Sequence, residues 1–390
     1  MQQKLNVSIS PGDAPGPTGE FRKTHYPDTS DAQWNDWRWQ MRNRLSSTAD
    51  LSQKFELTIA EKEALAFPGR PFPVSITPYY ASLIDNRPDD PLRKTMIPVG
   101  NEFVRGPGEY SDPLGEDPNS PVAGLVHRYP DRVLFLMTDH CPVYCRYCTR
   151  SRLVGGNADW AMTKASWQKA IDYIAARPNI HDVLISGGDP LIYGDQKLEW
   201  LLGHLSAITH IDFIRIGTKV PMVLPQRITP ELCKMLAQFH PLYFSIHVTH
   251  ENELTAESRQ ACELLSDSGI PLGSQTVLLK GVNDNADALK SMFRRLLRMR
   301  VKPYYLLQCD PIEGSAHFRT PIKKGIEIMR ALRGRLSGYG IPRFIVDLPE
   351  GGGKIALEPD YLEKIENDDW IFLSDRDSKH YKYHDPGTSL

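Results

Sequence analysis

Short apolar runs recur along the chain from Arg132 onward, and amphipathic segments separate them. The runs are Val133–Met137, Val183–Ser186, Phe213–Gly217, Leu242–His247, Leu272–Leu278 and Tyr304–Gln308. After the first run, successive starts lie about 30 residues apart, which is the length of one βα unit. Apolar positions at helical spacing fill the gaps, for example in Trp167–Ala176, Glu231–Phe239 and Ala286–Arg300. Alternating strands and helices predict an α/β fold with a parallel sheet.

The number of strand–helix units favours an open, partial (βα)6-type barrel over a closed eightfold one. A further apolar run, Phe344–Asp347, follows the last predicted helix, and Trp370–Leu373 is a candidate strand near the C-terminus. In parallel folds of this kind, chemistry gathers at the carboxyl ends of the strands. Residues that directly follow the runs are therefore the first candidates for a site.

The first third of the chain carries helix signals instead. Ser30 and Gln33 form a capping-box pair. Four apolar residues follow at the spacing of one helix face: Trp34, Trp37, Met41 and Leu45. Two further helix starts are predicted, at Thr58 with Glu61 and at Thr77 before Pro78. The tryptophan face is expected to pack against the main domain.

Composition and charge fit one large α/β domain with smaller parts around it. The chain has 390 residues, of which 41% are hydrophobic and 24% charged. We expect a flexible leader at 1–20, a helical region at 21–125, the partial barrel at 126–340 and a C-terminal segment at 341–390. The net charge of −2, without a block of like charge, argues against binding to nucleic acid or an anionic membrane.

Neither a membrane span nor a secretory signal is expected. No apolar run reaches the ~18 residues that would cross a bilayer. Residues 1–20 lack the apolar core of a signal peptide. The expected location is therefore the cytoplasm.

Three of the six cysteines, Cys141, Cys145 and Cys148, lie on one short loop after the first strand run. Three thiolates can hold three irons of a 4Fe–4S cluster and leave the fourth iron open for the amino and carboxylate groups of S-adenosylmethionine. The turn Gly187–Asp189 after the next run supports this interpretation, because its glycines let the backbone approach a cofactor. The alternatives are a zinc site with His140 as a fourth ligand, and cysteines that only pack in a core.

Eight segments, spread over nearly the whole chain, carry a family resemblance. They are Trp34–Leu45, Thr77–Asp85, His127–Arg132, Cys141–Arg150, Leu224–Leu232, Gln308–Asp310, His317–Pro321 and Asp347–Lys354. In these segments the chain resembles the lysine 2,3-aminomutase family of the radical S-adenosylmethionine superfamily. The resemblance implies an isomerase that converts L-lysine to β-lysine by radical 1,2-amino migration. It also implies a 4Fe–4S cluster, S-adenosylmethionine, pyridoxal 5′-phosphate and an electron donor such as flavodoxin or ferredoxin.

The resemblance assigns a role to each matching residue. The cysteines Cys141, Cys145 and Cys148 would bind the cluster, and Lys354 would be the catalytic lysine that binds pyridoxal phosphate covalently. The other implied residues are Arg128, Tyr129 and Arg132 for pyridoxal phosphate, Gly187, Gly188, Asp189, His247 and Gln275 near S-adenosylmethionine, and Arg150, Asp310 and Asp347 for the substrate.

The local chemistry agrees with several of these roles. Gly351–Gly353 give Lys354 the flexible approach that suits a covalent cofactor lysine. A phosphate-binding loop is the rival interpretation of this run, and it fails because the loop needs a glycine at Leu348 and a hydroxyl at Ile355. Asp310 and Asp347 are otherwise turn-capping residues, which is the commoner fate of an aspartate after a strand.

The chain departs from the family pattern at its C-terminus. Cys262 matches an internal cysteine that binds zinc in the family, but no cysteine follows Cys309. Structural zinc is therefore expected to be absent, whereas a homo-oligomer is still expected. Leu348 and Glu350 stand where the family usually has alanine and glycine, beside the proposed substrate segment, so the choice of cationic amino acid stays open.

Three alternative functions follow from this pattern. The nearest is an arginine 2,3-aminomutase, with a guanidinium in place of the ammonium. The second is a lysine aminomutase that acts in translation-factor modification. The third, from a different class, is a zinc or electron-transfer protein without catalysis. No nucleic-acid or membrane partner is expected.

Overall fold

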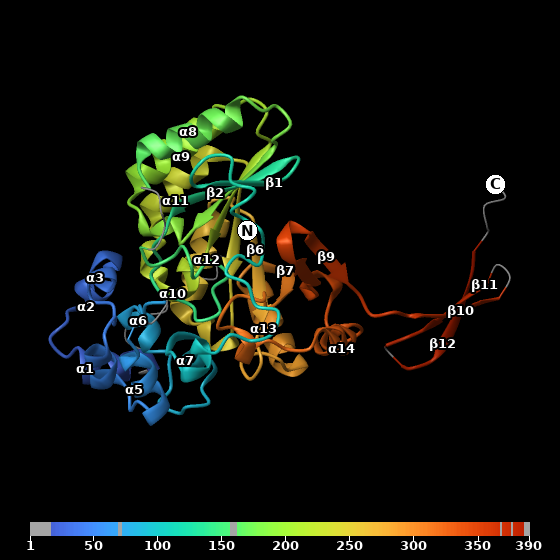
Figure 1. The fold of residues 1–390 in the computed structure, drawn as a ribbon, viewed down its shortest axis with the longest axis horizontal. Helices are drawn as coiled ribbons and strands as arrows, with labels where there is room; N and C mark the ends of the chain where they lie inside the picture. The colour runs from blue at the N-terminus through green and yellow to red at the C-terminus, as the bar shows by residue number, and fades with distance from the viewer. Residues whose placement is uncertain (1–16, 69–71, 157–161, 367–368, 376, 386–390) are drawn as a thin grey trace, which may run out of the picture.

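A nine-stranded sheet forms the centre of the molecule in the computed structural model (Figure 1). The structure describes the whole chain except residues 1–16, 69–71, 157–161, 367–368, 376 and 386–390. The strands of the sheet are β1 (Leu125–Tyr129), β2 (Arg132–Thr138), β3 (Asp182–Gly187), β4 (Phe213–Thr218), β5 (Leu242–His247), β6 (Leu272–Leu278), β7 (Val301–Gln308), β8 (Arg343–Leu348) and β9 (Gly353–Leu357).

The strands lie side by side in chain order, from β1 at one edge to β9 at the other. Strands β2 to β8 run parallel, whereas β1 and β9 are antiparallel to their neighbours. Within the described residues the two edges do not pair, so the sheet stays open. The predicted partial barrel is confirmed, and each of the six apolar runs lies in one of the strands β2 to β7.

Helices connect the parallel strands and cover one face of the sheet. They are α8 (Lys164–Ala175), α9 (Asp195–Ser206), α10 (Val220–Val223), α11 (Pro230–Leu236), α12 (Ala256–Asp267), α13 (Ala286–Arg298) and α14 (Ile322–Leu332). Side-chain caps start several of them. Asn285, for example, accepts hydrogen bonds from the first N–H groups of α13, which fixes where that helix begins.

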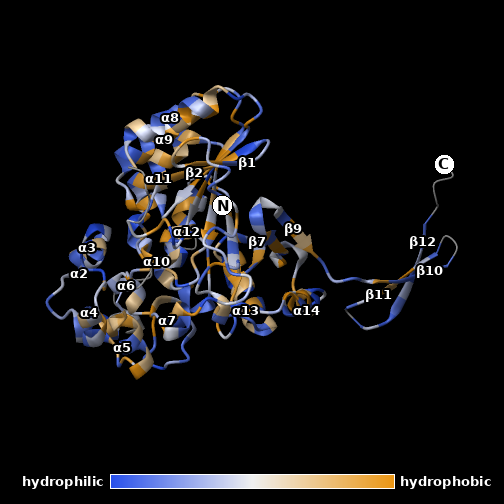
Figure 2. Cartoon of the chain, viewed as in Figure 1, coloured by the Kyte–Doolittle hydropathy of each residue, from blue (hydrophilic) through white to orange (hydrophobic). Residues whose placement is uncertain are grey.

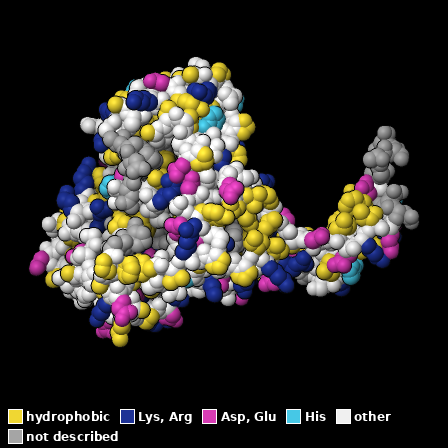
Figure 3. Space-filling model, in the orientation of Figure 1, with side chains coloured by type: hydrophobic (Ala, Val, Ile, Leu, Met, Phe, Trp, Pro, Cys, Tyr) yellow, Lys and Arg dark blue, Asp and Glu magenta, His cyan; other side chains and the backbone are white. Residues whose placement is uncertain are grey.

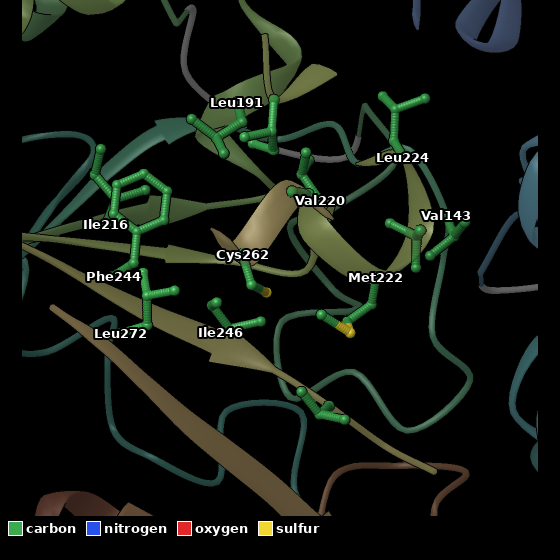
Figure 4. Close-up of a cluster of buried hydrophobic side chains, with 14 of the residues drawn as sticks. Val143, Leu191, Ile216, Val220, Met222, Leu224, Phe244, Ile246, Cys262 and Leu272 are labelled. Atoms are coloured by element: carbon green, nitrogen blue, oxygen red, sulfur yellow. The ribbon is translucent and has the colours of Figure 1, made fainter. Parts of the chain in front are cut away.

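The core lies between the sheet and these helices. Ile216, Phe244 and Ile246 of β4 and β5 pack with Met222 of α10 and Cys262 of α12 (Figure 4). All five side chains are buried. Each large apolar side chain that is removed from water in this way stabilises the fold by roughly 1.5–3 kcal/mol. Cys262 is therefore part of the apolar core. The hydropathy colouring shows the same separation, with apolar strands inside and polar helix faces outside (Figure 2).

The N-terminal region consists of short helices. They are α1 (Pro17–His25), α2 (Asp31–Trp34), α3 (Trp37–Arg42), α4 (Thr48–Lys54), α5 (Ile59–Ala66), α6 (Pro78–Ala81), α7 (Pro91–Met96) and the 3-10 turn η1 (Gly100–Phe103). The predicted starts at Ser30, Thr58 and Thr77 are confirmed by side-chain caps.

The single helix expected from Ser30 to Leu45 is wrong. Helix α2 ends at Trp34, and Asp36 then accepts a hydrogen bond from the N–H of Arg38 (2.8 Å) and starts α3 as a new N-cap. Leu45 lies beyond α3 and pairs with Ile76 in a β-bridge. The four apolar residues do pack on the core, with Trp34 and Leu45 buried and Trp37 and Met41 half-buried. The helix ends because the side chain of Asp36 caps a new helix instead of continuing the first one.

The N-terminal region packs on the loops that follow the strands. Trp34 is buried in the same core cluster as the sheet, which confirms the expected packing. Thr77 donates a hydrogen bond from its hydroxyl to the carbonyl oxygen of Val223, at the end of α10 (2.7 Å). The Tyr79 hydroxyl lies 2.7 Å from that of Thr255. This region therefore covers the end of the sheet where a site is expected.

Two predicted boundaries fall within elements of the structure. Residues 17–20 of the expected leader belong to α1, while 1–16 lie outside the described residues. The C-terminal segment expected from residue 341 begins inside the sheet, because β8 and β9 complete it. Beyond Leu357 a separate antiparallel sheet, the arm, stands away from the body (Figure 1). Its strands are β10 (Leu362–Glu366), β11 (Asp369–Leu373) and β12 (His380–His384).

The predicted strand at Trp370–Leu373 is confirmed as part of β11. None of the helices in the described ranges combines the length and apolar character that crossing a bilayer requires. Positive and negative side chains alternate over the face shown in Figure 3, without a large area of one sign.

Candidate functional site

The cysteine loop follows β2, and the N-terminal region holds it from outside. Arg44 donates a hydrogen bond from Nη1 to the carbonyl oxygen of Cys141 (2.9 Å). The N–H of Arg146 donates to the carbonyl oxygen of Thr95 (2.9 Å). The buried guanidinium of Arg146 also pairs with Glu102 of η1. The loop is thus fixed between the sheet and the helical region.

The donor set of this loop fits an iron–sulfur cluster. Burial is the main cause that raises the pKa of Cys141, Cys145 and Cys148, to about 12 for Cys148. A bound metal ion reverses this, because it deprotonates the thiols that coordinate it. Within the described residues no group of three or more His, Cys, Asp or Glu side chains is arranged to hold a metal ion. In a 4Fe–4S cluster each thiolate binds a different iron, so the three sulfur atoms do not have to converge on one metal ion.

The glycine turn after β3 has a steric cause within the chain. Gly187 has a φ of +118°, and a Cβ there would lie 2.3 Å from the carbonyl oxygen of Thr138. A Cβ on Gly188 would lie 2.2 Å from the carbonyl oxygen of His140. The two glycines therefore let the turn pack directly against the start of the cysteine loop. Their role toward S-adenosylmethionine stays a prediction.

Asp189 ties this turn to the end of β4. Its buried carboxylate accepts hydrogen bonds from the Thr218 hydroxyl (2.8 Å), the N–H of Lys219 (2.7 Å) and the N–H of Leu191 (3.1 Å). Its own N–H donates to the carbonyl oxygen of His140 (2.8 Å). The carboxylate is thus held as a positioning group among the ends of three strands.

His247 and Gln275 lie opposite each other on β5 and β6, and their side chains are 3.0 Å apart. Burial, followed by the charges of Lys219 and Arg150, lowers the pKa of His247 to about 3. The imidazole is therefore neutral at physiological pH. A neutral ring nitrogen accepts the hydrogen bond from the Gln275 amide. The pair offers a polar, uncharged edge beside the cysteine loop.

A buried ion pair behind the cysteine loop was missed by sequence reasoning. Lys219 Nζ lies 2.6 Å from Glu253, which also accepts a hydrogen bond from the Tyr80 hydroxyl (2.6 Å). The Tyr147 hydroxyl, within the loop, lies 2.6 Å from the hydroxyl of Thr249, and Lys219 also donates to that hydroxyl (2.9 Å). A lone lysine after a strand carries no pattern that would have singled it out.

Lys354 and Asp347 face each other across the antiparallel strands β9 and β8. The Lys354 ammonium pairs with one carboxylate oxygen of Asp347, and Arg128 pairs with the other (3.0 Å). Asp347 is nearly fully buried, whereas the Lys354 side chain is 34% exposed. The Tyr129 hydroxyl accepts hydrogen bonds from the N–H of Lys354 (3.1 Å) and from Arg128 (3.3 Å). Four predicted residues are therefore in direct contact.

Asp310 follows β7 and lies beside this group. The hydroxyl of Thr149 donates a hydrogen bond to its carboxylate (2.7 Å). The pKa of Asp310 is raised to about 6 overall: burial is the largest cause and Asp347 also raises it, while Thr149, Lys354 and Arg150 act in the opposite direction. Two buried carboxylates thus share one region with the Lys354 ammonium.

Arg150 is held by a glutamate that sequence reasoning missed. Glu116 accepts from Nε of Arg150 (3.0 Å) and from Nη2 (2.7 Å), and it is 5% exposed. Arg132 contacts the group around Lys354 through Tyr129. Its guanidinium stacks over the Tyr129 ring at 4.1 Å and pairs with the adjacent Asp131. A phosphate contact of Arg132 stays a prediction.

The chain matches two family models. One is the radical SAM superfamily, over residues 135–292, and the other is described as lysine-2,3-aminomutase, over residues 329–386. The first match implies a 4Fe–4S cluster and S-adenosylmethionine. A solved radical SAM methyltransferase from Sphaerobacter thermophilus is similar with a TM-score of 0.38 and 19% identity, over 57% of this chain and 67% of that chain.

Several curated relatives are similar over most of their length. The L-lysine 2,3-aminomutase of Clostridium subterminale is 51% identical over 86% of this chain and 81% of that protein. The enzyme of the same name from Bacillus subtilis is 46% identical over 86% and 72%. The glutamate 2,3-aminomutase of Clostridioides difficile is 42% identical over 91% and 84%. With this degree of identity and coverage, the chain belongs to the lysine 2,3-aminomutase family of radical SAM enzymes.

Proposed function

We propose that the protein is an L-lysine 2,3-aminomutase, which moves the α-amino group of lysine to the neighbouring carbon and so forms β-lysine. The single observation that carries the choice of substrate is the buried pair Asp310 and Asp347 beside the Lys354 ammonium. The relatives named L-lysine 2,3-aminomutase support the same choice.

The contacts of Lys354 illustrate what the acidic pair accepts. A lysine ammonium pairs with Asp347 and acts on the charge of Asp310. The distal ammonium of a lysine substrate is the same chemical group, and it would take this place once Lys354 holds pyridoxal phosphate. Charge-assisted hydrogen bonds of this kind contribute roughly 1.5–3 kcal/mol each.

The named residues also define the places of the cofactors. We propose that Cys141, Cys145 and Cys148 hold the cluster and that Gly187, Gly188, Asp189, His247 and Gln275 surround S-adenosylmethionine. Arg128, Tyr129 and Arg132 would hold pyridoxal phosphate, and Arg150 would receive the substrate carboxylate. When bound, the cluster and S-adenosylmethionine supply a carbon radical, and pyridoxal phosphate lets the nitrogen migrate.

A second candidate substrate is glutamate, because one relative is a glutamate 2,3-aminomutase. The acidic pair argues against it. A glutamate side chain would place a third carboxylate beside two buried ones, and like charges in a region of low dielectric repel strongly. The guanidinium of arginine prefers a planar bidentate arrangement, so arginine stays an outcome of the test.

Asp310→Asn is expected to lower kcat/KM for lysine by about tenfold or more, because ~1.4 kcal/mol corresponds to a factor of ten. Product is measured by chromatography with mass detection. Asp310 contacts Thr149 and not Lys354, so the cluster and cofactor spectra should not change. Asp347→Asn is a less selective test, since Asp347 also pairs with Lys354 and Arg128.

Cys233→Ser, a buried position in α11 outside the site, is the matched control and should retain wild-type kcat/KM. If Asp310→Asn processes lysine as efficiently as the wild type, the cation pocket is wrong. If the wild type isomerises arginine or glutamate faster than lysine, the proposed substrate is wrong.

The activity is expected to rise with pH through about 6. Asp310 must be ionised to bind an ammonium, and burial raises the pKa of its carboxyl to that value. Below it the protonated carboxyl loses the charge that attracts the substrate, so kcat/KM for lysine should fall as the pH decreases. In Asp310→Asn this acidic limb should disappear. An unchanged limb in that variant would assign the titration to another group.

We extend the proposal to two protein partners. An electron donor such as flavodoxin or ferredoxin would reduce the cluster. A second copy of the chain would contact the arm, which stands away from the body (Figure 1). The arm exposes Ile365, Tyr381 and Tyr383 at 51%, 48% and 66%. Exposed apolar side chains of this kind are typical of contact surfaces between proteins.

A further inference from the structure

One segment with no recognisable motif touches every part of the substrate region. This segment, the strap, comprises residues 110–119. Its backbone and side chains contact the neighbourhood of four predicted site residues. The contacts are Tyr110 N–H to Pro311 O (2.8 Å) beside Asp310, Glu350 N–H to Pro113 O (3.2 Å) before Lys354, Arg128 Nη1 to Leu114 O (2.9 Å), and the pair of Glu116 with Arg150.

The pair of Glu116 and Arg150 has a defined geometry. Glu116 accepts from Nε and Nη2, so it occupies one edge of the planar guanidinium. An arginine carries five N–H donors in a rigid fork, and a second edge, formed by Nη1 and Nη2, is left for another carboxylate. Glu116 is 5% exposed, so its carboxylate is buried against the arginine that it orients.

Without Glu116, a different partner for Arg150 is at hand. Thr149, the residue before Arg150, donates a hydrogen bond to Asp310 (2.7 Å), so Arg150 follows directly on a residue in contact with Asp310. Arg150 and Asp310 also act on each other electrostatically. An arginine side chain has several rotatable bonds and can turn toward a nearby carboxylate that has no cationic partner of its own. An ion pair between Arg150 and Asp310 would block substrate binding at both ends of the site. Arg150 is proposed to bind the α-carboxylate, and Asp310 is proposed to bind the distal ammonium.

We propose that Glu116 is a positioning residue that keeps Arg150 turned toward the substrate α-carboxylate and prevents it from pairing with Asp310. The strap thereby keeps the two charged ends of the site apart in the absence of substrate. This inference rests on the proposed function, because Arg150 must be the residue that receives the carboxylate.

The test compares L-lysine with L-lysinamide, in which a neutral amide replaces the carboxylate. Affinity is measured from the absorbance change of bound pyridoxal phosphate in the holoenzyme. Glu116→Gln has almost the same shape as the native residue but no charge. It should weaken lysine binding by about tenfold more than lysinamide binding, because lysinamide loses only the contact of its distal ammonium with Asp310 and has no carboxylate for Arg150 to receive. Asp117→Asn is the matched control, because Asp117 lies next in the strap and pairs with Arg152 (2.9 Å) rather than with Arg150. Arg152 also lies 3.9 Å from Glu116, so this control removes a neighbouring charge without touching the pair of Glu116 and Arg150.

The pH profile gives a readout that a merely structural role would not move. If Arg150 turns to Asp310 in Glu116→Gln, the added positive charge lowers the pKa of Asp310. The acidic limb of kcat/KM should then move below its wild-type position. Glu116→Asp, which keeps the charge, should restore part of the preference for lysine. This variant also serves if Glu116→Gln does not fold.

The outcomes separate this inference from the proposed function. Loss of the preference for lysine over lysinamide in both Glu116→Gln and Arg150→Gln supports the inference. The double variant should then lose no more than Arg150→Gln alone, because Glu116 acts only through Arg150. Loss in Arg150→Gln with full preference in Glu116→Gln overturns the inference and leaves the proposed function intact. Full preference in Arg150→Gln overturns the proposed role of Arg150 and the inference with it.

Discussion

Replacing any one of Cys141, Cys145 and Cys148 by serine is expected to abolish turnover and to disturb the iron–sulfur spectrum. Three thiolates are the minimum that can hold a 4Fe–4S cluster with one open iron, and a serine hydroxyl does not ionise at neutral pH as a cluster thiol does. The loop itself should persist, because Arg44 and Arg146 hold it through backbone and carboxylate contacts rather than through sulfur.

The measurement combines product formation, iron content and electron paramagnetic resonance of the reduced protein. Cys233→Ser is the matched control, since its side chain is buried in the core of α11 outside the loop. It should keep the spectrum and the activity. A wild-type preparation that contains no iron and is fully active would contradict the assignment.

The strands were predictable from the sequence because both faces of a parallel sheet are largely buried. Apolar runs such as Phe213–Gly217 must then recur at the length of one βα unit. The N-terminal helices were less predictable. The apolar spacing of Trp34 and Leu45 suggested one helix, but the choice of Asp36 between a helix interior and an N-cap depends on a single local hydrogen bond.

Site residues could be predicted together only where they lie close to each other in the sequence. The cysteine loop and the segment Asp347–Lys354 each lie within eight residues. Glu116, by contrast, is 34 residues from Arg150 and lies in a segment without periodicity, so nothing in the sequence connects the two. An unpaired arginine in a buried site would have been a reason to look for a carboxylate partner.

The charges of the substrate region are balanced in a way that the sequence alone did not reveal. Two carboxylates have cationic partners: Asp347 pairs with Arg128 and Lys354, and Glu116 pairs with Arg150. Asp310 receives a hydrogen bond from the neutral hydroxyl of Thr149, and burial raises its pKa. Among these carboxylates, Asp310 therefore gains most from an incoming ammonium.

Lys354→Ala is expected to lose covalently held pyridoxal phosphate and to lower turnover by about 10³-fold or more, which corresponds to about 4 kcal/mol at 1.36 kcal/mol per factor of ten. The amine of Lys354 is the group that can bond to the cofactor aldehyde, and Gly351–Gly353 carry it to the edge of the sheet. Borohydride reduction of the wild type should fix the cofactor on Lys354, and peptide mapping identifies the labelled residue.

Lys354→Arg separates the two roles of this residue. The guanidinium can still pair with Asp347, so this variant should keep the fold and the iron–sulfur spectrum, but it cannot bond to the aldehyde and should be as inactive as Lys354→Ala. Both variants leave Arg128 as a partner of Asp347, so the buried carboxylate is not left unpaired. If Lys354→Arg retained wild-type turnover, or if borohydride fixed the label on another lysine, the catalytic lysine would have to be sought elsewhere in the chain. Inactivity of both variants with an intact cluster would show instead that the amine of Lys354, and not its charge, is what turnover requires.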